Sequence, residues 1–337
     1  ITEKIFDVMM SGAVPIYLGH PSTSKRIPKE CYIDRADFRD DAELYDYILE
    51  IGKKWVSPPY NADGWRLDVG DEISHSFWKW FRREIKAFKE DVLIVGENWF
   101  YAPAYLQGDE WDSLMNYHFR DAVLGFVGNG TLSATEFAGR MGFMRGTIHS
   151  ETYDVLWNLI DCHDTPRFMH AVKGSKKKQL LAASIQILSH GCPMIYYGDE
   201  VGMTGGNDPD CRRGMLWKDE LQDKSIFAYY KKLLALRKSE PCIVGGKQCI
   251  LCTDDENGIV IEERSLEDNK RIRKVVIIYH NGNKMADLPE YAGKYNLLKE
   301  EIFDAFVKEA FKSYTEKFGH EPKLYEVVIS DGARKLA

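Results

Sequence analysis

Three acidic side chains lie where apolar, strand-like stretches of the sequence end. Asp68 lies near the end of one stretch, Glu97 closes the next, and Asp164 follows a later one. The carboxyl ends of parallel strands meet at one edge of a sheet, where α/β folds place their sites. One nucleophile, one proton donor and a third stabilising acid are what a retaining glycosidase requires. A structural interpretation stays open, because acids at strand ends also cap helices or lie in solvated loops.

Two further residues accompany these acids. Arg66 precedes Asp68 by two residues, so both side chains share one face of a strand. An arginine in that position would hold Asp68 in its ionised form. His163 directly precedes Asp164 and could donate a hydrogen bond to a ligand hydroxyl. The 8 Trp, 18 Tyr and 16 Phe suit stacking against a sugar, although a large core explains them equally well.

These residues need a parallel sheet to bring them together. From residue 63 to 238, short buried strands alternate with helices, the pattern of βα units. Beyond residue 247 the pattern changes to strands alone, and Asn257-Gly258 is a strong hairpin signal. The expected strands are 64–69, 92–97, 113–117, 155–161 and 193–197, then 248–252, 258–264 and 273–280; the clearest helices are 75–89 and 177–188.

Composition excludes several classes of protein. The chain has 337 residues and a net charge of −7, which disfavours a nucleic-acid partner. Its apolar runs are shorter than the roughly 18 residues of a membrane span, so no membrane association is expected. Seven scattered cysteines predict reduced thiols and a cytoplasmic location. Cys249 and Cys252 form a CxxC in a strand-like stretch without a second pair, so no metal and no cofactor are predicted.

Several motifs together resemble glycoside hydrolase family 13, the α-amylase family. Three of them, Gly64-Trp65-Arg66-Leu67-Asp68, Gly96-Glu97-Asn98-Trp99 and Leu159-Ile160-Asp161-Cys162-His163-Asp164, surround the acids described above. The stretches 111–117, 196–203 and 208–213 agree in order and spacing. The combination is similar to the neopullulanase, maltogenic amylase and cyclomaltodextrinase branch.

The resemblance implies a role for each residue. It makes Asp68 the nucleophile, Glu97 the general acid/base and Asp164 the transition-state stabiliser. Arg66 and His163 become contacts of the first sugar subsite, and Trp99 stacks on sugar in the acceptor region. The implied substrate is an α-glucan oligosaccharide, and the family likeness raises a homodimer as an expectation.

The implied fold is a partial (β/α)8 barrel, an α/β architecture with a small antiparallel β-domain after it. The resemblance begins at the fourth barrel strand, and the earlier motif that shapes the sugar subsite is absent from this sequence. Because positioning contributes strongly to catalysis, we expect hydrolysis to be impaired relative to the full-length family.

Both ends of the sequence resemble other families. Residues 1–50 are similar to the nucleotide-sugar lobe of the α-1,3-fucosyltransferases, glycosyltransferase family 10, a Rossmann-like βα fragment. In that family a Glu-Lys pair contacts the GDP-fucose donor, which implies vestigial contacts for Glu3 and Lys4. Residues 305–336 resemble a galactokinase C-terminus through Tyr325-Glu326-Val327 and residues 331–336.

Three functional hypotheses follow. The leading one is a retaining hydrolase of α-1,4, and possibly α-1,6, glucans. The alternatives are a GDP-fucose-dependent transferase fragment and a non-catalytic remnant of a recombined or built chimera. The expected segments are a fucosyltransferase-like fragment over 1–52, the amylase-type barrel part over 53–240, a shortened β-domain over 241–303 and a galactokinase-like tail over 304–337.

Overall fold

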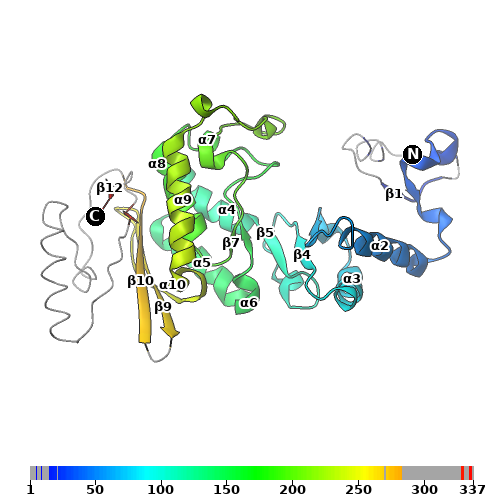
Figure 1. Ribbon diagram of the computed structural model, residues 1–337, viewed down its shortest axis with the longest axis horizontal. Coiled ribbons are helices and arrows are strands. Elements are labelled where there is room, and N and C mark those ends of the chain that lie inside the picture. The colour runs from blue at the N-terminus through cyan, green and yellow to red at the C-terminus, as the bar shows by residue number, and fades with distance from the viewer. Residues whose placement is uncertain are drawn as a thin grey trace, which may run out of the picture. The chain divides into compact units, whose positions relative to one another are not determined.

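The computed structural model (Figure 1) describes residues 5, 9, 15–20, 22–268, 271–282, 328–329 and 334–335. The chain divides into two compact units, the first made of Ile1–Trp65 and Ser74–Ile94 and the second of Arg66–Ile73 and Val95–Ala337. The helices are α2 Asp41–Trp55, α3 His75–Phe88, α4 Tyr117–Val123, α5 Ala134–Thr147, α6 Ser150–Tyr153, α7 Phe168–Ala171, α8 Lys176–Leu188, α9 Lys224–Ser239 and α10 Pro241–Gly245. The strands are β1 Ile16–Tyr17, β2 Ile33–Asp34, β3 Gly64–Leu67, β4 Leu93–Gly96, β5 Ser113–Asn116, β6 Trp157–Asn158, β7 Cys192–Pro193, β8 Lys247–Asp254, β9 Ile259–Asp268, β10 Arg271–His280, β11 Val328–Ile329 and β12 Arg334–Lys335.

The five strands expected between residues 63 and 238 form one sheet in the order β3-β4-β5-β6-β7. Pairing is parallel from β4 through β7, as βα units require. Strand β6 is much shorter than the expected 155–161, because the backbone leaves the sheet after Asn158 and the Cys162 N–H turns to the Thr165 hydroxyl at 3.0 Å. Strand β7 stops at Pro193, where the expected strand began. The five predicted strands follow one another in chain order. Strands β3 to β5 end within two residues of their predicted bounds, whereas β6 and β7 are much shorter than predicted.

The first unit packs helix α2 against helix α3. Asp40 begins α2 by accepting a hydrogen bond from the Glu43 N–H, and Ser74 begins α3 in the same way through Phe77. Gly52 lets the helices approach, since a Cβ there would lie 3.1 Å from the Phe81 ring. Strands β1 and β2 pair in parallel. The Rossmann-like assignment of the N-terminal fragment stays a prediction.

Helices α8 and α9 form the buried layer of the second unit. Ten of the thirteen residues of α8 are buried, and α9 packs along it. Two hydrogen bonds between side chains join them, from Gln179 to the Tyr230 hydroxyl at 3.2 Å and between Ser184 and Tyr229 at 2.7 Å. This pairing fixes the helical layer beside β7, with which α8 is also in contact.

Strands β8, β9 and β10 form the expected antiparallel sheet, in the order β10-β9-β8. The hairpin predicted at Asn257-Gly258 joins β8 to β9, and Gly258 adopts the positive φ of 64° that such a turn favours. Buried Glu262 and Arg264 form an ion pair at 2.9 Å within this sheet. Most of the galactokinase-like tail expected over 304–337 lies outside the described residues.

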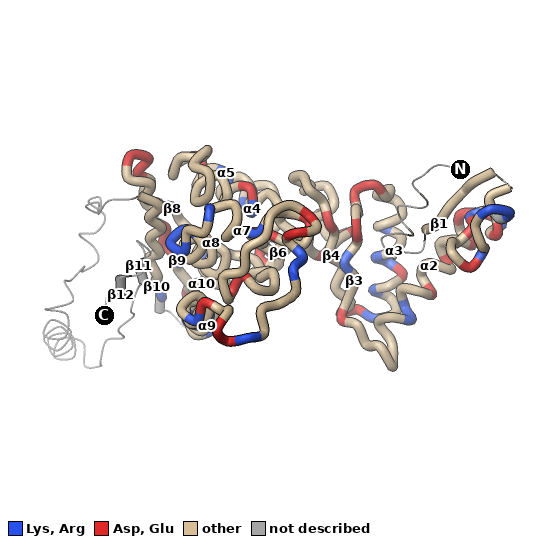
Figure 2. The backbone as a smooth tube through the Cα atoms, turned by 90° about the horizontal axis from the view of Figure 1, so that it is seen from above, with Lys and Arg blue, Asp and Glu red and all other residues tan. Residues whose placement is uncertain are grey.

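Charged residues of both signs alternate along the described chain (Figure 2), with no extended basic stretch in that part of the molecule. Within the same described ranges, no helix is both long enough and apolar enough to cross a membrane.

Candidate active site

Arg66, Asp68 and Glu97 form a compact set, which we call the first acid group. The Arg66 guanidinium contacts the Asp68 carboxylate through one terminal nitrogen and the Glu97 carboxylate, at 2.8 Å, through the other. The two acids therefore lie within the span of a single guanidinium. They differ in environment, because the Asp68 side chain is 75% exposed and that of Glu97 only 3%.

Backbone features fix Glu97 at the end of β4. Gly96 lies directly beneath the Trp111 indole, where a Cβ would come within 2.1 Å of the ring, so only glycine fits there. Val69 adopts a left-handed conformation with φ 47° and ψ 44°, which is strained for a β-branched residue. The strained turn directs the Val69 N–H to the Glu97 carboxylate at 2.9 Å. The strained backbone at Val69 thus helps to orient the Glu97 carboxylate, a candidate catalytic group.

His163, Asp164, Asp208 and Arg212 form a second acid group. One Asp164 oxygen lies 2.9 Å from His163 Nε2, and the other lies 2.7 Å from the Arg212 guanidinium. Arg212 also binds Asp208 at 2.6 Å. Desolvation opposes the charge of Arg212, but its pKa is still raised because Asp208 and Asp164 stabilise the cation. The Asp164 carboxyl group therefore lies between His163 and Arg212, with one oxygen on each.

Two buried thiols hold the peptide group that joins His163 to Asp164. The Asp164 N–H donates to Cys162 Sγ at 3.3 Å, and the Cys211 thiol donates to the His163 carbonyl at 3.0 Å. Both cysteines are fully buried. The second acid group thus depends on residues 162–164 and on the distant loop 208–213.

Tyr117, the first residue of α4, lies between the two groups. Its hydroxyl is 3.5 Å from the Glu97 carboxylate and 3.2 Å from Cys162 Sγ. Burial is the main cause that raises the pKa of Tyr117 far above its ordinary value, with Cys162 and Glu97 adding to it. The Trp99 ring stacks on Tyr117, with centroids 4.5 Å apart, and 47% of Trp99 remains exposed. Trp99 thus presents an aromatic surface beside the first acid group.

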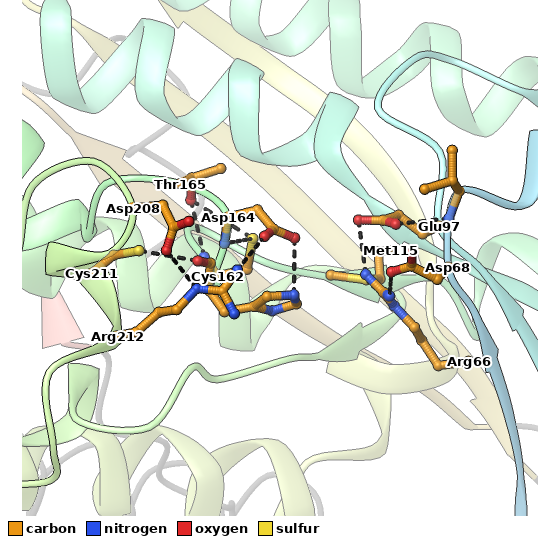
Figure 3. A network of polar contacts seen from close by, with 12 residues as sticks. Arg66, Asp68, Glu97, Met115, Cys162, Asp164, Thr165, Asp208, Cys211 and Arg212 are labelled. Carbon is orange, nitrogen blue, oxygen red and sulfur yellow. Dashed lines mark hydrogen bonds and ion pairs between the residues drawn. The ribbon is translucent and has the colours of Figure 1, made fainter. Parts of the chain in front are cut away.

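All six residues predicted for the hydrolase site lie in the second unit. Figure 3 shows Arg66, Asp68, Glu97 and Met115 on one side and Asp164, Cys162, Asp208 and Arg212 on the other. Tyr117 bridges the two sides through its hydroxyl. Glu3 and Lys4, the predicted nucleotide-sugar contacts, lie outside the described residues.

Comparison with known proteins identifies the family of the chain. The family described as "Alpha amylase, catalytic domain" matches residues 34–246, more than half of the chain. The chain belongs to the alpha-amylase family. A second family, glycosyltransferase family 10 (fucosyltransferase), matches residues 1–57 through its C-terminal part, so the two matches overlap.

Named relatives of this alpha-amylase family chain include two well-matched bacterial proteins. A cyclomaltodextrinase of Geobacillus thermopakistaniensis is 39% identical over 268 residues, which is 78% of this chain and 45% of the relative. Neopullulanase 2 of Thermoactinomyces vulgaris is 36% identical over 258 residues, 76% of this chain and 43% of that protein. The chain therefore spans less than half the length of these relatives.

A solved structure supports the same relationship. The cyclic α-maltosyl-(1→6)-maltose hydrolase of Arthrobacter globiformis superposes with a TM-score of 0.67 at 33% identity. The match covers 72% of this chain and 53% of the other. The fold of the described chain is therefore that of an alpha-amylase family protein over most of its length.

Sequence reasoning missed three members of the candidate site. Tyr117, Asp208 and Arg212 all lie in the motifs that carry the family resemblance, yet none of them received a role. Arg212 is four residues from Asp208, a local signal for pairing, but its partner Asp164 is 48 residues away in the chain. Only the folded loop 208–213 reveals that contact.

Three side chains of the types that bind metals come close together at the second acid group and the cysteine beside it. Atoms of Cys162, His163 and Asp164 lie within 4.8 Å of one another. Both Asp164 oxygens already bind His163 and the Arg212 guanidinium, and that positive charge opposes a cation at the same place. We therefore assign no metal to this set.

Proposed function

We propose that the site hydrolyses α-glucosidic bonds with retention of configuration, as a double displacement. The observation that carries this proposal is the single Arg66 guanidinium shared by Asp68 and Glu97, which keeps two carboxyl groups of unequal burial beside each other. Retaining glycosidases need two close carboxyl groups, about 5–5.5 Å apart. The names of the relatives, cyclomaltodextrinase and neopullulanase, favour α-glucans as substrates.

In this proposal Asp68 attacks the anomeric carbon. It is exposed, so a sugar can reach it, and its carboxylate pairs with the Arg66 guanidinium. Glu97 protonates the departing oxygen and then takes a proton from water. Its buried carboxylate is oriented by Arg66, the Val69 N–H and the Tyr117 hydroxyl. The exposed Asp68 is thus suited to form the bond to the sugar, and the buried Glu97 is suited to transfer the proton.

Asp164 would stabilise the positive charge that develops on the sugar ring. His163 and Arg66 would donate to sugar hydroxyls at the first subsite. Trp99 would stack on the acceptor sugar through its exposed surface, since its partner Tyr117 supports the ring from the other side.

Other features stay proposals beside this one. The chain divides in this proposal into segments 1–52, 53–240, 241–303 and 304–337. Helix α2 crosses the first of these boundaries. A cytoplasmic location is supported by the free cysteines and by a 35% identical relative from Bacillus subtilis named intracellular maltogenic amylase. A homodimer, the galactokinase-like tail and a rate below that of full-length relatives also stay predictions.

A GDP-fucose-dependent transferase is the second candidate, because the glycosyltransferase family 10 match covers residues 1–57. Its proposed contacts Glu3 and Lys4 have no described geometry, whereas the hydrolase site does. Binding of GDP-fucose to the whole chain, measured by calorimetry, distinguishes the two.

The test is hydrolysis of cyclodextrin and maltotriose, with the anomeric form of the first product followed by NMR. We expect α-configured product from the wild-type chain and loss of activity in Asp68→Asn and Glu97→Gln. Asp71→Asn, a nearby acid outside both groups, is the control and should retain activity. A β-configured product, or full activity in Asp68→Asn, would contradict the mechanism.

A further inference from the structure

Two aspartates lie buried directly behind the second acid group. Asp161 follows β6 by three residues and is 0% exposed, while Asp199 follows β7 and is 1% exposed. Asp161 accepts a hydrogen bond from the Phe168 N–H through one oxygen. The side chains of Asp161 and Asp199 lie close enough for a hydrogen bond between their carboxyl groups.

The positive charge around this pair is insufficient for two carboxylates. Arg167 is fully buried, but its guanidinium is 3.5 Å from Asp199, longer than the roughly 2.7–2.9 Å of a charge-assisted pair. Arg167 instead donates to the carbonyls of Tyr197 at 2.7 Å and Cys211 at 3.0 Å. Its charge is therefore spread over several acceptors and does not neutralise Asp199 alone.

The other charged or titratable groups that face the pair do not correct this balance. Arg120 on α4 acts on Asp161, but it is paired with Asp121 at 2.8 Å. Glu200 adds a further negative charge beside Asp199. Burial raises the pKa of Tyr230 on α9, and its hydroxyl accepts from Gln179, so it adds no positive charge.

The hydrogen-bond inventory leads to the same conclusion. One oxygen of each aspartate, Asp161 Oδ1 and Asp199 Oδ2, is buried without a hydrogen-bond donor among the described residues. Two ionised carboxylates can only accept, so they cannot bond to each other unless one carries a proton. We propose that Asp161 and Asp199 share one proton, carried by Asp199, and that this pair positions the segment holding His163 and Asp164.

Electrostatics agree with the assignment of the proton. Burial is the largest cause that raises the pKa of Asp199 well above its usual value, and the Asp161 carboxylate raises it further. Burial also raises the pKa of Asp161, but the hydrogen bond from Asp199 and that from Phe168 act in the opposite direction. Asp199 is thus the donor and Asp161 the acceptor.

The shared proton would connect two loops that meet at the site. Asp161 immediately precedes Cys162, His163 and Asp164, and its second bond reaches Phe168 beyond them. Asp199 belongs to the loop after β7, which also supplies the Tyr197 carbonyl to Arg167. The positioning role rests on the proposed function, since it assumes that Asp164 acts on substrate; the shared proton itself does not.

The substitutions Asp199→Asn and Asp199→Leu distinguish a shared proton from a purely structural role of Asp199. Asp199→Asn keeps a donor toward Asp161 and removes the proton that can be lost, whereas Asp199→Leu removes the donor. Glu200→Gln is the control, because it removes an adjacent charge, whose carboxylate accepts from the Gly198 N–H at 2.8 Å, and leaves both aspartates in place. Each full-length variant is examined by infrared difference spectroscopy, urea unfolding against pH, and amide hydrogen exchange.

The raised pKa fixes the sign of the pH effect. Between the unfolded pKa of Asp199, about 3.9, and its higher folded pKa, the native state binds the extra proton, so stability falls as pH rises. The unfolding equilibrium constant of the wild type should therefore rise, relative to Asp199→Asn, by up to about tenfold per pH unit in that window. Glu200→Gln should keep this slope, but its window should end at a lower pH than in the wild type, because a negative charge beside Asp199 is removed.

The infrared and exchange experiments give further outcomes. Wild type at neutral pH should show a protonated carboxyl band that is lost in Asp199→Asn and retained in Glu200→Gln. Amide hydrogen exchange over residues 161–168 should be faster in Asp199→Leu and unchanged in Asp199→Asn. In steady-state kinetics, Asp199→Leu alone should lower kcat by a larger factor than it changes KM. A wild type without that band, or an asparagine variant as unstable as the leucine variant at every pH, would overturn the proposal. If the band is present and no glucan is hydrolysed, the proposed function fails while the shared proton stands.

Discussion

The two acid groups of the site are held together in different ways. In the first, Arg66 and Asp68 are two residues apart and Glu97 follows a neighbouring strand, so short chain segments and one guanidinium define the set. In the second, Asp164 depends on Arg212, 48 residues further along the chain. The first group is thus built mainly by strand register and the second by a distant loop.

This difference has a consequence for catalysis and for stability. The first group carries the residues proposed to form and break bonds, and its geometry follows from β3 and β4 with the strained turn at Val69. The second group, held by Cys162, Cys211 and Arg212, can be loosened from the loop 208–213 without touching the first. Substitutions should therefore separate loss of chemistry from loss of positioning.

The largest effect is expected from breaking the first group at Arg66. Arg66→Met removes the one cation shared by Asp68 and Glu97, and we expect kcat to fall by about a hundredfold to a thousandfold, as for loss of a preorganised charge-stabilising donor. Arg66→Lys should restore little, because an ammonium cannot contact both carboxylates through a fork. Steady-state hydrolysis of maltotriose measures this, and near-normal kcat in Arg66→Met would refute the shared role.

The same contrast explains what could be predicted from sequence. Alternation along a strand and the position of acids at strand ends depend on neighbouring residues, so Arg66, Asp68 and Glu97 were found and lie together. The hairpin at Gly258 was likewise encoded locally. Arg212 and Tyr117 were missed because their partners Asp164 and Glu97 are distant in the chain, and no periodicity reports such contacts.

The length of strand β6 was predicted poorly for a related reason. Residues 155–161 are apolar enough for a long strand, but side-chain and backbone bonds after Asn158 compete with the sheet: Cys162 turns to Thr165, and Asp161 accepts from Phe168. Apolar residues indicate burial, and burial alone does not distinguish a strand from a buried loop.

Breaking the second group should cost less. Arg212→Met removes the donor to Asp164 and Asp208, and the loss of a charged hydrogen bond, about 1.5–3 kcal/mol, corresponds to roughly a tenfold to hundredfold fall in kcat/KM. Arg213→Met is the control, since Arg213 pairs with Asp210 at 2.6 Å and does not contact Asp164 in the described structure. Equal effects of the two variants would remove the special role of Arg212.

The connection between the groups should matter still less. Tyr117→Phe removes a hydroxyl that lies 3.5 Å from Glu97 and 3.2 Å from Cys162, while the ring still supports Trp99. Because the bond to Glu97 is long, we assign it about 1 kcal/mol and expect roughly a fivefold fall in kcat. Burial raises the pKa of Tyr117, so the effect should not vary between pH 6 and 9. A strong pH dependence in that range would contradict a neutral hydroxyl.

The smallest effect concerns the free energy of unfolding and the residue that caps helix α9. Asp223 caps α9, and its N–H donates to the Val201 carbonyl at 3.0 Å. Burial opposes its charge, but hydrogen bonds from Lys176 and Ser225 outweigh it and lower the pKa of Asp223. Asp223→Ala should cost about 1 kcal/mol of unfolding free energy at neutral pH, as for loss of a helix cap, without changing kcat.

The pH dependence of that loss follows from its sign. A lowered folded pKa means that the stabilisation is present above the unfolded pKa, about 3.9, and is lost as pH falls through the folded value. Urea unfolding between pH 7 and 3 should therefore show the Asp223→Ala deficit shrinking toward acid. Asp219→Ala, which removes an exposed partner of Lys224, serves as the control; a deficit that grows toward acid would contradict the assignment.

The central claim is that Asp68 forms a covalent bond to the sugar while Glu97 moves the proton. The most direct measurement is mass spectrometry of the chain after reaction with a fluorinated α-glucosyl fluoride whose intermediate hydrolyses slowly. We predict that a peptide containing Asp68 gains the mass of one glycosyl group. This adduct should turn over faster when Glu97 is intact than in Glu97→Gln, and Asp68→Asn should form no adduct. A label on Glu97 or Asp164, or hydrolysis without any label on Asp68, would contradict the account.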